Sequence, residues 1–209
     1  MIEVLIVDDH QLMRQGLRQI LEDTDDIVAA DEAQDGQQAI EKVRARHFDL
    51  VLLDVAMPGM DGLDAIHMLR QEQPDLSVLV LTMYPEEQYA VRFLKAGAAG
   101  YLTKDSASEE LITAIRKIAQ GGRYVTISLA EKLVQYLGVD SSRPAHEVLS
   151  DREYQVMRMI ASGQTNSEIA AELSLSVKTV STYRTRILTK LGLRNNAEIM
   201  QYAVREGLV

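Results

Sequence analysis

The first 120 residues of this 209-residue chain repeat one pattern five times: a short apolar run precedes a longer segment with helical periodicity. Two of the runs, Leu50–Leu53 and 78–81, are continuously apolar, which is typical of strands buried on both faces. Strands that alternate with helices predict a parallel sheet covered by helices on both sides. We expect strands at Ile2–Val7, 27–30, Leu50–Leu53, Ser77–Thr82 and 99–102, and helices at about 12–21, 37–46, 63–71, 86–96 and 109–120.

Residues 149–209 contain no strand pattern and several signals of helix boundaries. Two stretches match the capping box, in which a Ser or Thr and a Glu three residues later bond the first backbone amides of a helix. A capping serine and helix-ending glycines mark two further helices. Four short helices predict a small all-α domain. The signals are Ser150-x-x-Glu153, Thr165-x-x-Glu168, Ser176 before Val177–Leu191 and Gly192, and Asn196–Arg205 before Gly207.

A stretch without apolar periodicity separates these two regions. Gly121-Gly122 ends the fifth helix, and residues 138–144 are rich in Gly, Ser and Pro, which is typical of a linker. We therefore expect an α/β domain with a five-stranded, flavodoxin-like parallel sheet at 1–122. A linker with a short helix over 128–137 follows at 123–147, and the small all-α domain occupies 148–209.

Charge is distributed unevenly along the chain. The net charge of −9 argues by itself against nucleic-acid binding, because phosphate contacts need a basic surface. Residues 1–122 carry 11 basic and 22 acidic residues, a net charge of −11, whereas 149–209 carry 8 and 6, a net charge of +2. From Lys178 to Arg194 there are five basic residues and no acidic one. The C-terminal region can therefore bind nucleic acid although the whole chain is acidic.

The composition excludes several classes of protein. The chain has no Cys, so it has no disulfide, no thiol nucleophile and no thiolate zinc site. It lacks an apolar run of roughly 18 residues, so we expect no membrane span. Its amino terminus lacks the basic region of a signal peptide. We expect a cytoplasmic protein that does not contact the membrane.

Three carboxylates are expected at one edge of the sheet. Asp8 and Asp9 directly follow the first strand, and Asp54 follows the third. In a sheet with the order 2-1-3-4-5 these strands are neighbours, and ligand sites lie beyond the carboxyl ends of strands. Two carboxylates about 4 Å apart repel by roughly 4 kcal/mol at an effective dielectric near 20, so a positive group must compensate them. Mg²⁺ prefers oxygen ligands and is the expected cofactor.

Two further residues bring chemistry to the same edge. Lys104 follows the fifth strand, and Thr82 ends the fourth. A carboxylate nucleophile, a metal ion, an ammonium and a hydroxyl are the groups that transfer a phosphoryl group onto an aspartate. Each residue alone is more typical of a turn, a helix cap or a solvated surface. The ordered set, with each member at a strand end, is much more specific and predicts phosphoryl transfer onto an aspartate at this edge.

Four stretches of the N-terminal region match a known domain. They are Val7-Asp8-Asp9-His10, Leu53-Asp54-Val55-Ala56-Met57-Pro58-Gly59-Met60-Asp61-Gly62, Leu81-Thr82 and Gly97-Ala98-Ala99-Gly100-Tyr101-Leu102-Thr103-Lys104. Residues 2–122 thereby resemble the receiver domain of two-component response regulators. The resemblance implies that Asp54 takes a phosphoryl group from a sensor histidine kinase. It also implies that Asp9, Asp54 and the Ala56 carbonyl ligate Mg²⁺ directly. Asp8 would act through water.

The same resemblance implies how the signal leaves the site. Thr82 and Tyr101 would form a switch pair, in which the hydroxyl moves to the phosphoryl group and the aromatic ring turns inward. Lys104 would contact the phosphoryl group as well. A receiver promotes only its own phosphorylation and dephosphorylation, so we do not expect an enzyme.

The predicted helix Val177–Leu191 has two unlike faces. Val177, Val180, Ile187 and Leu191 recur at helical spacing and form an apolar stripe. The opposite face carries hydroxyls and cations, which suits the major groove of DNA, because Arg and Lys contact phosphates or guanine while Ser and Thr reach base edges. A solvated charged face is the alternative, although such faces usually mix signs. The candidate DNA contacts are Lys178, Thr179, Ser181, Thr182, Tyr183, Thr185, Arg186 and Lys190.

Four stretches of the C-terminal region match a second known domain. They are Leu149-Ser150-Asp151-Arg152-Glu153, Gly163-Gln164-Thr165-Asn166-Ser167-Glu168-Ile169-Ala170, Leu175-Ser176-Val177-Lys178-Thr179-Val180 and Lys190-Leu191. Residues 146–209 thereby resemble the LuxR-type helix-turn-helix domain, and a receiver with this output resembles the NarL/FixJ class of response regulators. The resemblance implies base contacts to double-stranded DNA at Ser181, Thr182 and Thr185. It also implies a homodimer on activation, paired through the fourth helix.

Two other functions stay open. An Asp-nucleophile phosphatase also joins Asp, Mg²⁺ and Lys on a parallel sheet, but it usually carries a second acid two residues after the nucleophile, where this chain has Ala56. A DNA-binding regulator that ignores phosphorylation would use its receiver only as an interaction module. We interpret the chain as a transcription regulator that is controlled by phosphorylation of Asp54.

Overall fold

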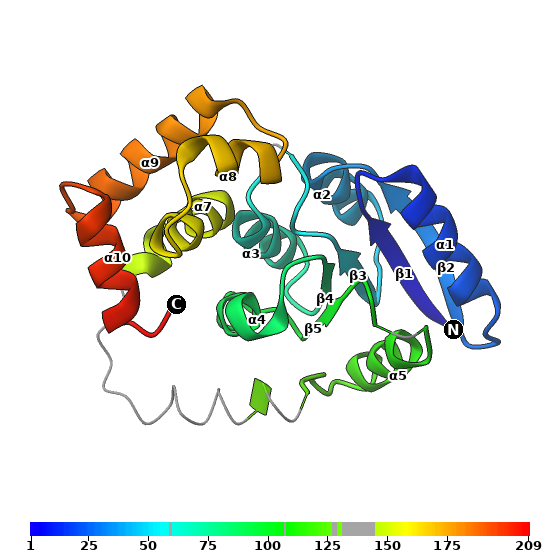
Figure 1. The fold of residues 1–209 in the computed structure, drawn as a ribbon. Coiled ribbons are helices and arrows are strands. Elements are labelled where there is room, and N and C mark those ends of the chain that lie inside the picture. Colours follow the sequence, from blue (N-terminus) through cyan, green and yellow to red (C-terminus); the bar gives the residue numbers. More distant parts are fainter. Residues whose placement is uncertain (59, 107, 127–128, 131–144) are drawn as a thin grey trace. The chain divides into compact units, whose positions relative to one another are not determined.

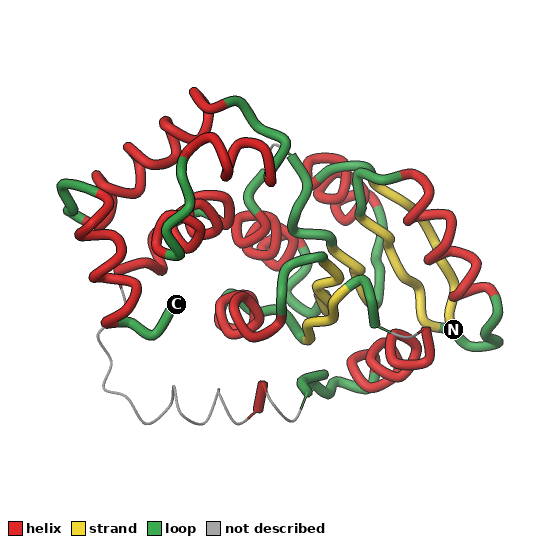
Figure 2. Tube along the Cα trace, viewed as in Figure 1, coloured by secondary structure: helices red, strands yellow, loops and turns green. Residues whose placement is uncertain are grey.

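The computed structural model (Figures 1 and 2) describes all residues except 59, 107, 127–128 and 131–144, and it leaves out the side chains of 87 and 88. The chain divides into two compact units, Met1–Val139 and Asp140–Val209. The first is an α/β unit and the second is helical. No helix in the described part of the chain is long and apolar enough to cross a membrane.

Five parallel strands form the sheet of the first unit, in the order β2-β1-β3-β4-β5. This order confirms the predicted 2-1-3-4-5 arrangement. The bounds of β1, β3 and β4 agree with the apolar runs of the sequence, and β5 begins one residue later than predicted. The strands are β1 (Ile2–Val7), β2 (Ile27–Ala33), β3 (Leu50–Leu53), β4 (Ser77–Thr82) and β5 (Gly100–Thr103).

Five helices cover the two faces of this sheet, as the alternation of strands and helices predicted. In Figure 1, α1 and α5 lie on one face and α2, α3 and α4 on the other. Leu17 and Leu21 of α1 and Leu111 and Ile115 of α5 join one core with residues of the strands. The helices are α1 (Gln11–Glu22), α2 (Gly36–Ala45), α3 (Gly62–Glu72), α4 (Glu86–Lys95) and α5 (Ser108–Ala119).

The strand β2 is longer than the sequence predicted, because it runs to Ala33 rather than to residue 30. Asp31 and Glu32 interrupt the apolar run, which is why the pattern ended early. β2 is an edge strand of the sheet, so charged side chains on it can stay at the surface. Asp31 pairs with Lys42, and Glu32 pairs with Arg14 at 3.1 Å. These ion pairs let an acidic segment continue the strand.

In its described residues, 145–209, the second unit has four α-helices that follow a short 3-10 helix. Both predicted capping boxes are present, since Ser150 and Glu153 bond each other's backbone, as do Thr165 and Glu168. The inward stripe of α9 is confirmed at Val180 and Ile187, whereas Val177 is 47% exposed because it lies at the first position of the helix. The elements are η1 (Ala145–Val148), α7 (Asp151–Ala161), α8 (Asn166–Glu172), α9 (Val177–Leu191) and α10 (Asn196–Arg205).

The described ends of the predicted linker 123–147 are each bound to a folded unit. The N–H of Tyr124 donates to the carbonyl of Ala99 (2.9 Å). At the other end, the N–H of His146 donates to the hydroxyl of Tyr202 (3.0 Å). The described residues at both ends of the predicted linker therefore contact folded structure. The helix predicted over 128–137 lies, apart from residues 129 and 130, outside the described residues.

Candidate phosphorylation site and DNA interface

The sheet itself aligns the predicted site residues. Its ladder of hydrogen bonds continues one residue past three strands, and each added bond ends on the last carbonyl of a neighbouring strand. These hydrogen bonds fix the backbone of each of the three residues relative to a neighbouring strand. This register brings two aspartates and a lysine to one edge of the sheet. The bonds run from Asp8 to Ala33 (3.1 Å), from Asp54 to Val7 (2.9 Å) and from Lys104 to Thr82 (2.9 Å).

Lys104 joins the two buried aspartates. Its Nζ lies 2.6 Å from Oδ2 of Asp54 and 2.6 Å from Oδ2 of Asp8. The side chains are only 5%, 3% and 2% exposed, so these charges interact with little screening by solvent. Burial opposes the charge of Lys104, but the hydrogen bonds and charges of Asp54 and Asp8 outweigh it and raise the pKa of Lys104. The lysine therefore stays cationic beside the predicted phosphate acceptor.

The second oxygens of both aspartates are also bound. Oδ1 of Asp54 accepts from the N–H of Ala56 (2.8 Å), and Oδ1 of Asp8 accepts from the N–H of His10 (2.8 Å). Hydrogen bonds to both oxygens favour one orientation of each carboxylate. The loop after β3 thus holds the Asp54 side chain before any ligand binds.

Asp9 lies at the solvent side of the cluster, with its side chain 30% exposed. His10, which the sequence pattern did not single out, places Nδ1 2.8 Å from Oδ1 of Asp9. Ligand atoms of Asp8, Asp9, His10 and Asp54 all lie within 4.8 Å of one another. Three carboxylates against one lysine leave an excess of negative oxygen donors. The set fits a hard divalent cation such as Mg²⁺.

The predicted switch residues are both fully buried. The hydroxyl of Tyr101 donates to the carbonyl of Tyr84 (2.7 Å), and its ring lies 6.0 Å from that of Phe93. The ring therefore already has the inward position that the resemblance assigns to the activated receiver. Thr82 lies at the end of β4, and its Oγ1 is 3.5 Å from the N–H of Tyr84. The acceptor at Tyr84 is a backbone carbonyl, which every residue has, so the sequence could not predict this hydrogen bond.

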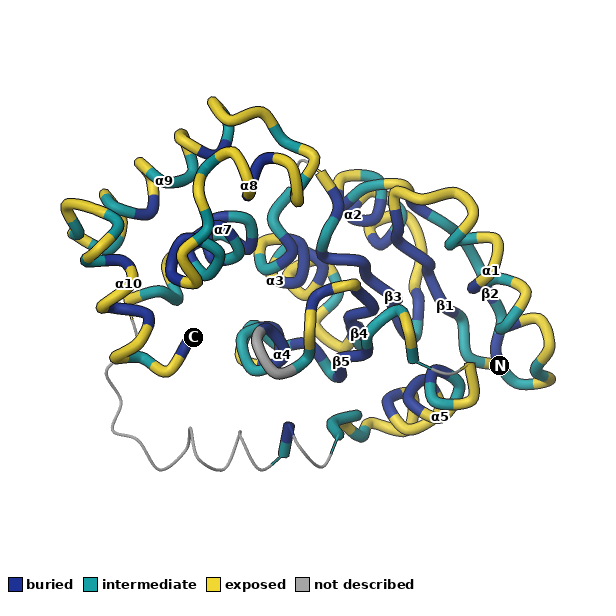
Figure 3. The backbone as a smooth tube through the Cα atoms, in the orientation of Figure 1, coloured by how far each residue is buried: buried dark blue, intermediate teal, exposed yellow. Residues whose placement is uncertain are grey.

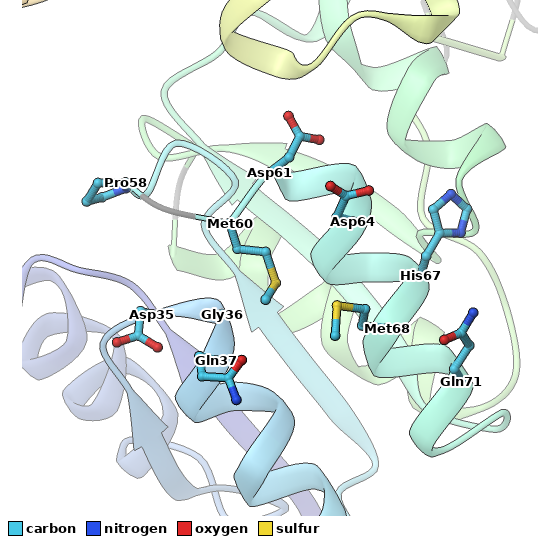
Figure 4. Close-up of a pocket in the computed structure, with 10 residues that line it drawn as sticks. All are labelled: Asp35, Gly36, Gln37, Pro58, Met60, Asp61, Asp64, His67, Met68 and Gln71. Atoms are coloured by element: carbon cyan, nitrogen blue, oxygen red, sulfur yellow. The ribbon is translucent and has the colours of Figure 1, made fainter.

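A hollow of about 810 Å³ lies between α2 and α3, and none of the predicted site residues lines it. Figure 4 shows the side chains of Met60 and Met68 turned into this hollow, with Asp64 and His67 along α3. The sulfur of Met60 packs on Gly36, where a Cβ would lie 2.9 Å from it. The hollow is therefore a gap between two helices, distinct from the carboxylate cluster.

The outer face of α9 carries most of the predicted DNA contacts. Figure 3 shows exposed residues along this helix, and they alternate with the buried positions of the core. No acidic residue lies in α9. The face is therefore positively charged and accessible, as a helix that enters the major groove must be. Lys178, Ser181, Thr182, Thr185, Arg186 and Lys190 are exposed, and Thr179 and Tyr183 are partly buried.

The hydroxyls on this face are not free donors. Oγ1 of Thr182 donates to the carbonyl of Lys178 (3.0 Å), and Oγ1 of Thr185 donates to that of Ser181 (3.0 Å). Each hydroxyl keeps its lone pairs and its neighbouring methyl group for a partner. These threonines therefore present hydrogen-bond acceptors and methyl groups on the outer face of α9.

Lys190 differs from the other predicted DNA contacts. Its Nζ lies 2.6 Å from Oε2 of Glu153, whose side chain is 3% exposed, and 3.3 Å from the carbonyl of Val148. Burial raises the pKa of Glu153, but the hydrogen bonds from Lys190 and Ser150 outweigh it and lower the pKa overall. Lys190 therefore holds α9 against the start of α7, and a bound phosphate would have to compete with Glu153 for it.

Comparison with known proteins identifies the domain family of each unit. Residues 4–116, more than half of the chain, match the family described as response regulator receiver domain. Residues 147–203 match bacterial regulatory proteins of the luxR family. The two matches correspond to the α/β unit and the helical unit. The fold and the matches thus define a receiver joined to a LuxR-type output domain.

Relatives extend the match to the whole chain. The response regulator UvrY of Escherichia coli K12 is 39% identical over 209 residues, which are 100% of this chain and 96% of UvrY. The response regulator GacA of Pseudomonas protegens is 41% identical over 209 residues, which are 100% of this chain and 98% of GacA. The chain belongs to the response regulators with a LuxR-type DNA-binding domain, which are phosphorylation-regulated transcription factors.

Solved structures show the same architecture. RcsB of Salmonella typhimurium is 27% identical with a TM-score of 0.62, and the match covers 98% of this chain and 100% of RcsB. A structure of two RcsB dimers bound to two parallel DNAs matches at 27% identity and a TM-score of 0.59, over 97% of this chain and 98% of the other. These matches support both the five-stranded sheet and the helical second unit.

Proposed function

We propose that Asp54 is the phosphoryl acceptor of this response regulator and that its phosphorylation controls DNA binding through α9. The observation that carries the proposal is the contact of Lys104 with both Asp54 and Asp8 at the carboxyl edge of the sheet. A cationic group that is already in place beside a carboxylate stabilises negative charge as it arrives on that carboxylate.

In the proposed reaction, a carboxylate oxygen of Asp54 attacks the phosphorus of a phosphohistidine on a sensor kinase. The O–P bond forms as the N–P bond breaks, and the electron pair of the broken bond stays on the donor imidazole. Lys104 binds an oxygen of the transferred group, because its ammonium already contacts Asp54. Thr82, at the end of β4, offers its hydroxyl to the phosphoryl group.

Asp9, Asp54 and the carbonyl of Ala56 would hold Mg²⁺, with Asp8 bound through water. When bound, Mg²⁺ supplies positive charge that neutralises the carboxylates and the phosphoryl oxygens. Exposure of Asp9 gives the ion a path from solvent. The receiver thus promotes its own phosphorylation and dephosphorylation, without acting on other substrates.

The phosphoryl group adds a charge of about −1.5 to −2 and shifts an equilibrium between two states of the chain. In the activated state two copies pair and present two α9 helices to DNA half-sites about 34 Å apart. The chain works in the cytoplasm, where both a sensor kinase and DNA are accessible. The exposed basic face of α9 and the RcsB–DNA structures support this part of the proposal.

The acceptor is tested by incubating the chain with acetyl phosphate and Mg²⁺ and locating the modified residue by mass spectrometry. Phosphate is expected on Asp54 of the wild type and on no residue of Asp54→Ala. Asp64→Ala, which removes an exposed carboxylate of α3, is the matched control and should be modified like the wild type. Stoichiometric phosphate on Asp54→Ala would show that another residue is the acceptor.

A further inference from the structure

The chain returns to the sheet after α5. Residue 124 forms a parallel bridge with Gly100 of β5, and its N–H donates to the carbonyl of Ala99 (2.9 Å). A Cβ at Gly100 would lie 3.0 Å from the carbonyl oxygen of Tyr124, an unusually tight contact, so glycine favours this close approach of the segment. The start of the interdomain segment is thus bound to the edge of the receiver sheet.

Two residues later, Thr126 makes hydrogen bonds in two directions. Its hydroxyl donates to Oε1 of Glu86 (2.5 Å), and Oγ1 of Thr126 accepts from the N–H of Leu129 (3.2 Å). The carbonyl of Thr126 also accepts from the N–H of Ala130 (3.0 Å), and Leu129 is buried. Thr126 therefore caps the helical turn at 129–130 and ties it to α4.

Glu86 occupies a special place, because it is the first residue of α4. Only three residues separate it from Thr82, which lies at the edge of the Asp54 site. One of them is Pro85, with φ near −60°, and another is Tyr84, whose carbonyl is held by Tyr101. A short loop that is restrained in this way transmits a displacement of Thr82 to Glu86 rather than absorbing it.

We propose that the Glu86–Thr126 hydrogen bond is a latch through which the Asp54 site acts on the segment that leads to the DNA-binding domain. The proposal rests on Asp54 being the phosphoryl acceptor. When Thr82 moves to the phosphoryl group, Glu86 moves with it, the hydrogen bond to Thr126 breaks, and the capped turn at 129–130 opens. Residues 129 and 130, which lead toward the DNA-binding domain, then lose their connection to α4.

The same segment offers a matched control. The hydroxyl of Tyr124 donates to Oε1 of Glu110 (2.9 Å), which belongs to α5 rather than to α4. Glu110 is not connected to Thr82 through the loop before α4. Tyr124→Phe therefore removes a hydrogen bond from the same segment and leaves the Thr126 hydroxyl and the Glu86 carboxylate in place. Thr126→Val removes the latch hydroxyl, Thr126→Ser keeps it, and Glu86→Ala removes the acceptor.

The latch is tested by hydrogen exchange of the Leu129 and Ala130 amides in the full chain, with and without acetyl phosphate and Mg²⁺. The fraction phosphorylated is measured by intact mass in the same samples. In the wild type, Tyr124→Phe and Thr126→Ser, exchange should rise about tenfold on phosphorylation, as expected for loss of one hydrogen bond to a charged group. In Thr126→Val and Glu86→Ala, exchange should be fast from the start and change little.

Two results would overturn the latch: protected amides in phosphorylated wild type, or a wild-type response in both Thr126→Val and Glu86→Ala. If acetyl phosphate leaves the mass of the wild type unchanged, the assignment of Asp54 as acceptor fails, and the latch fails with it. The intact mass therefore separates failure of the latch alone from failure of the proposed function.

Discussion

The ammonium of Lys104 lies 2.6 Å from a carboxylate oxygen of Asp54, and both side chains are almost fully buried. A second aspartate, Asp8, contacts the same ammonium at 2.6 Å. Lys104, Asp54 and Asp8 directly follow β5, β3 and β1, so the fold alone brings their side chains together. The arrangement places the ammonium of Lys104 beside the carboxylate to which we propose that the phosphoryl group is transferred.

Lys104→Met should slow phosphorylation of Asp54 by on the order of 100-fold, because it removes a charge that stabilises the transferred group. The initial rate of phosphate incorporation from acetyl phosphate measures this effect. Lys42→Met breaks the Lys42–Asp31 pair at the edge of the sheet and serves as control, with an unchanged rate expected. A Lys104→Met chain that reacts as fast as this control would remove Lys104 from the mechanism.

Asp9→Asn should lower the affinity for Mg²⁺ by on the order of 10–100-fold, as changes around metal ligands commonly do. Asp9 is partly exposed, so the variant should fold. Binding of Mg²⁺ to the folded state raises the melting temperature of the wild type, and fitting the stabilisation against Mg²⁺ concentration to RT ln(1 + [L]/Kd) gives the affinity. Asp64→Asn is the control. Equal fitted Kd values in Asp9→Asn and the wild type would place the ion elsewhere.

Lys190→Met should destabilise the helical unit by about 1–2 kcal/mol. The value is below the usual 3–5 kcal/mol for a broken buried pair because the Lys190 side chain is 41% exposed and solvent screens it. Denaturant unfolding measures the change. If DNA affinity falls in Lys190→Met while stability is unchanged, Lys190 contacts DNA directly.

The same pair predicts a pH dependence. Burial raises the pKa of Glu153, but Lys190 and Ser150 lower it overall, so the pKa in the folded state lies below that in the unfolded state. The stabilisation is complete above the unfolded value of about 4.3 and is lost as pH falls through the lower folded value. The difference in unfolding free energy between wild type and Glu153→Gln should be constant from about pH 6 to 8 and shrink in acid. A difference that grows in acid would show that the pKa of Glu153 is raised in the folded state rather than lowered.

Contacts of α9 should separate into two kinds. Lys178→Ala should weaken binding to all DNA sequences and reduce the slope of log affinity against log salt by about one, because one phosphate contact is lost. Thr182→Val keeps the methyl group and removes the acceptor oxygen, so it should change sequence preference and leave the salt slope unchanged. Salt titrations on specific and random DNA distinguish these effects, and identical profiles for the two variants would contradict this division.

The strand ends were predictable because apolar runs that stop at polar residues mark where buried strands leave the core. Asp8, Asp54 and Lys104 could be placed at one edge from strand order alone. The Lys190–Glu153 pair could not be foreseen, because both residues carry other signals: Lys190 lies in a basic helix and Glu153 in a capping box. The contact arises only when α7 packs on α9.

Three other features depend on tertiary structure in the same way. The edge position of β2 lets Asp31 and Glu32 extend a strand that periodicity ended early. The hydrogen bond from Tyr101 ends on a backbone carbonyl, and the residue type at that position does not predict such a contact. The Glu86–Thr126 contact joins residues 40 positions apart, and the sequence pattern assigned Thr126 only to a linker.

Control of DNA binding by Asp54 is tested most directly by the affinity of the full chain for a DNA fragment recovered by genome-wide capture. The affinity is measured with and without acetyl phosphate and Mg²⁺, for the wild type and for Asp54→Asn. Phosphorylation should raise the affinity of the wild type by roughly 5–150-fold, the usual range of coupling between two sites, and leave Asp54→Asn unchanged. Equal affinity of phosphorylated and untreated wild type, or an equal rise in Asp54→Asn, would contradict control through Asp54.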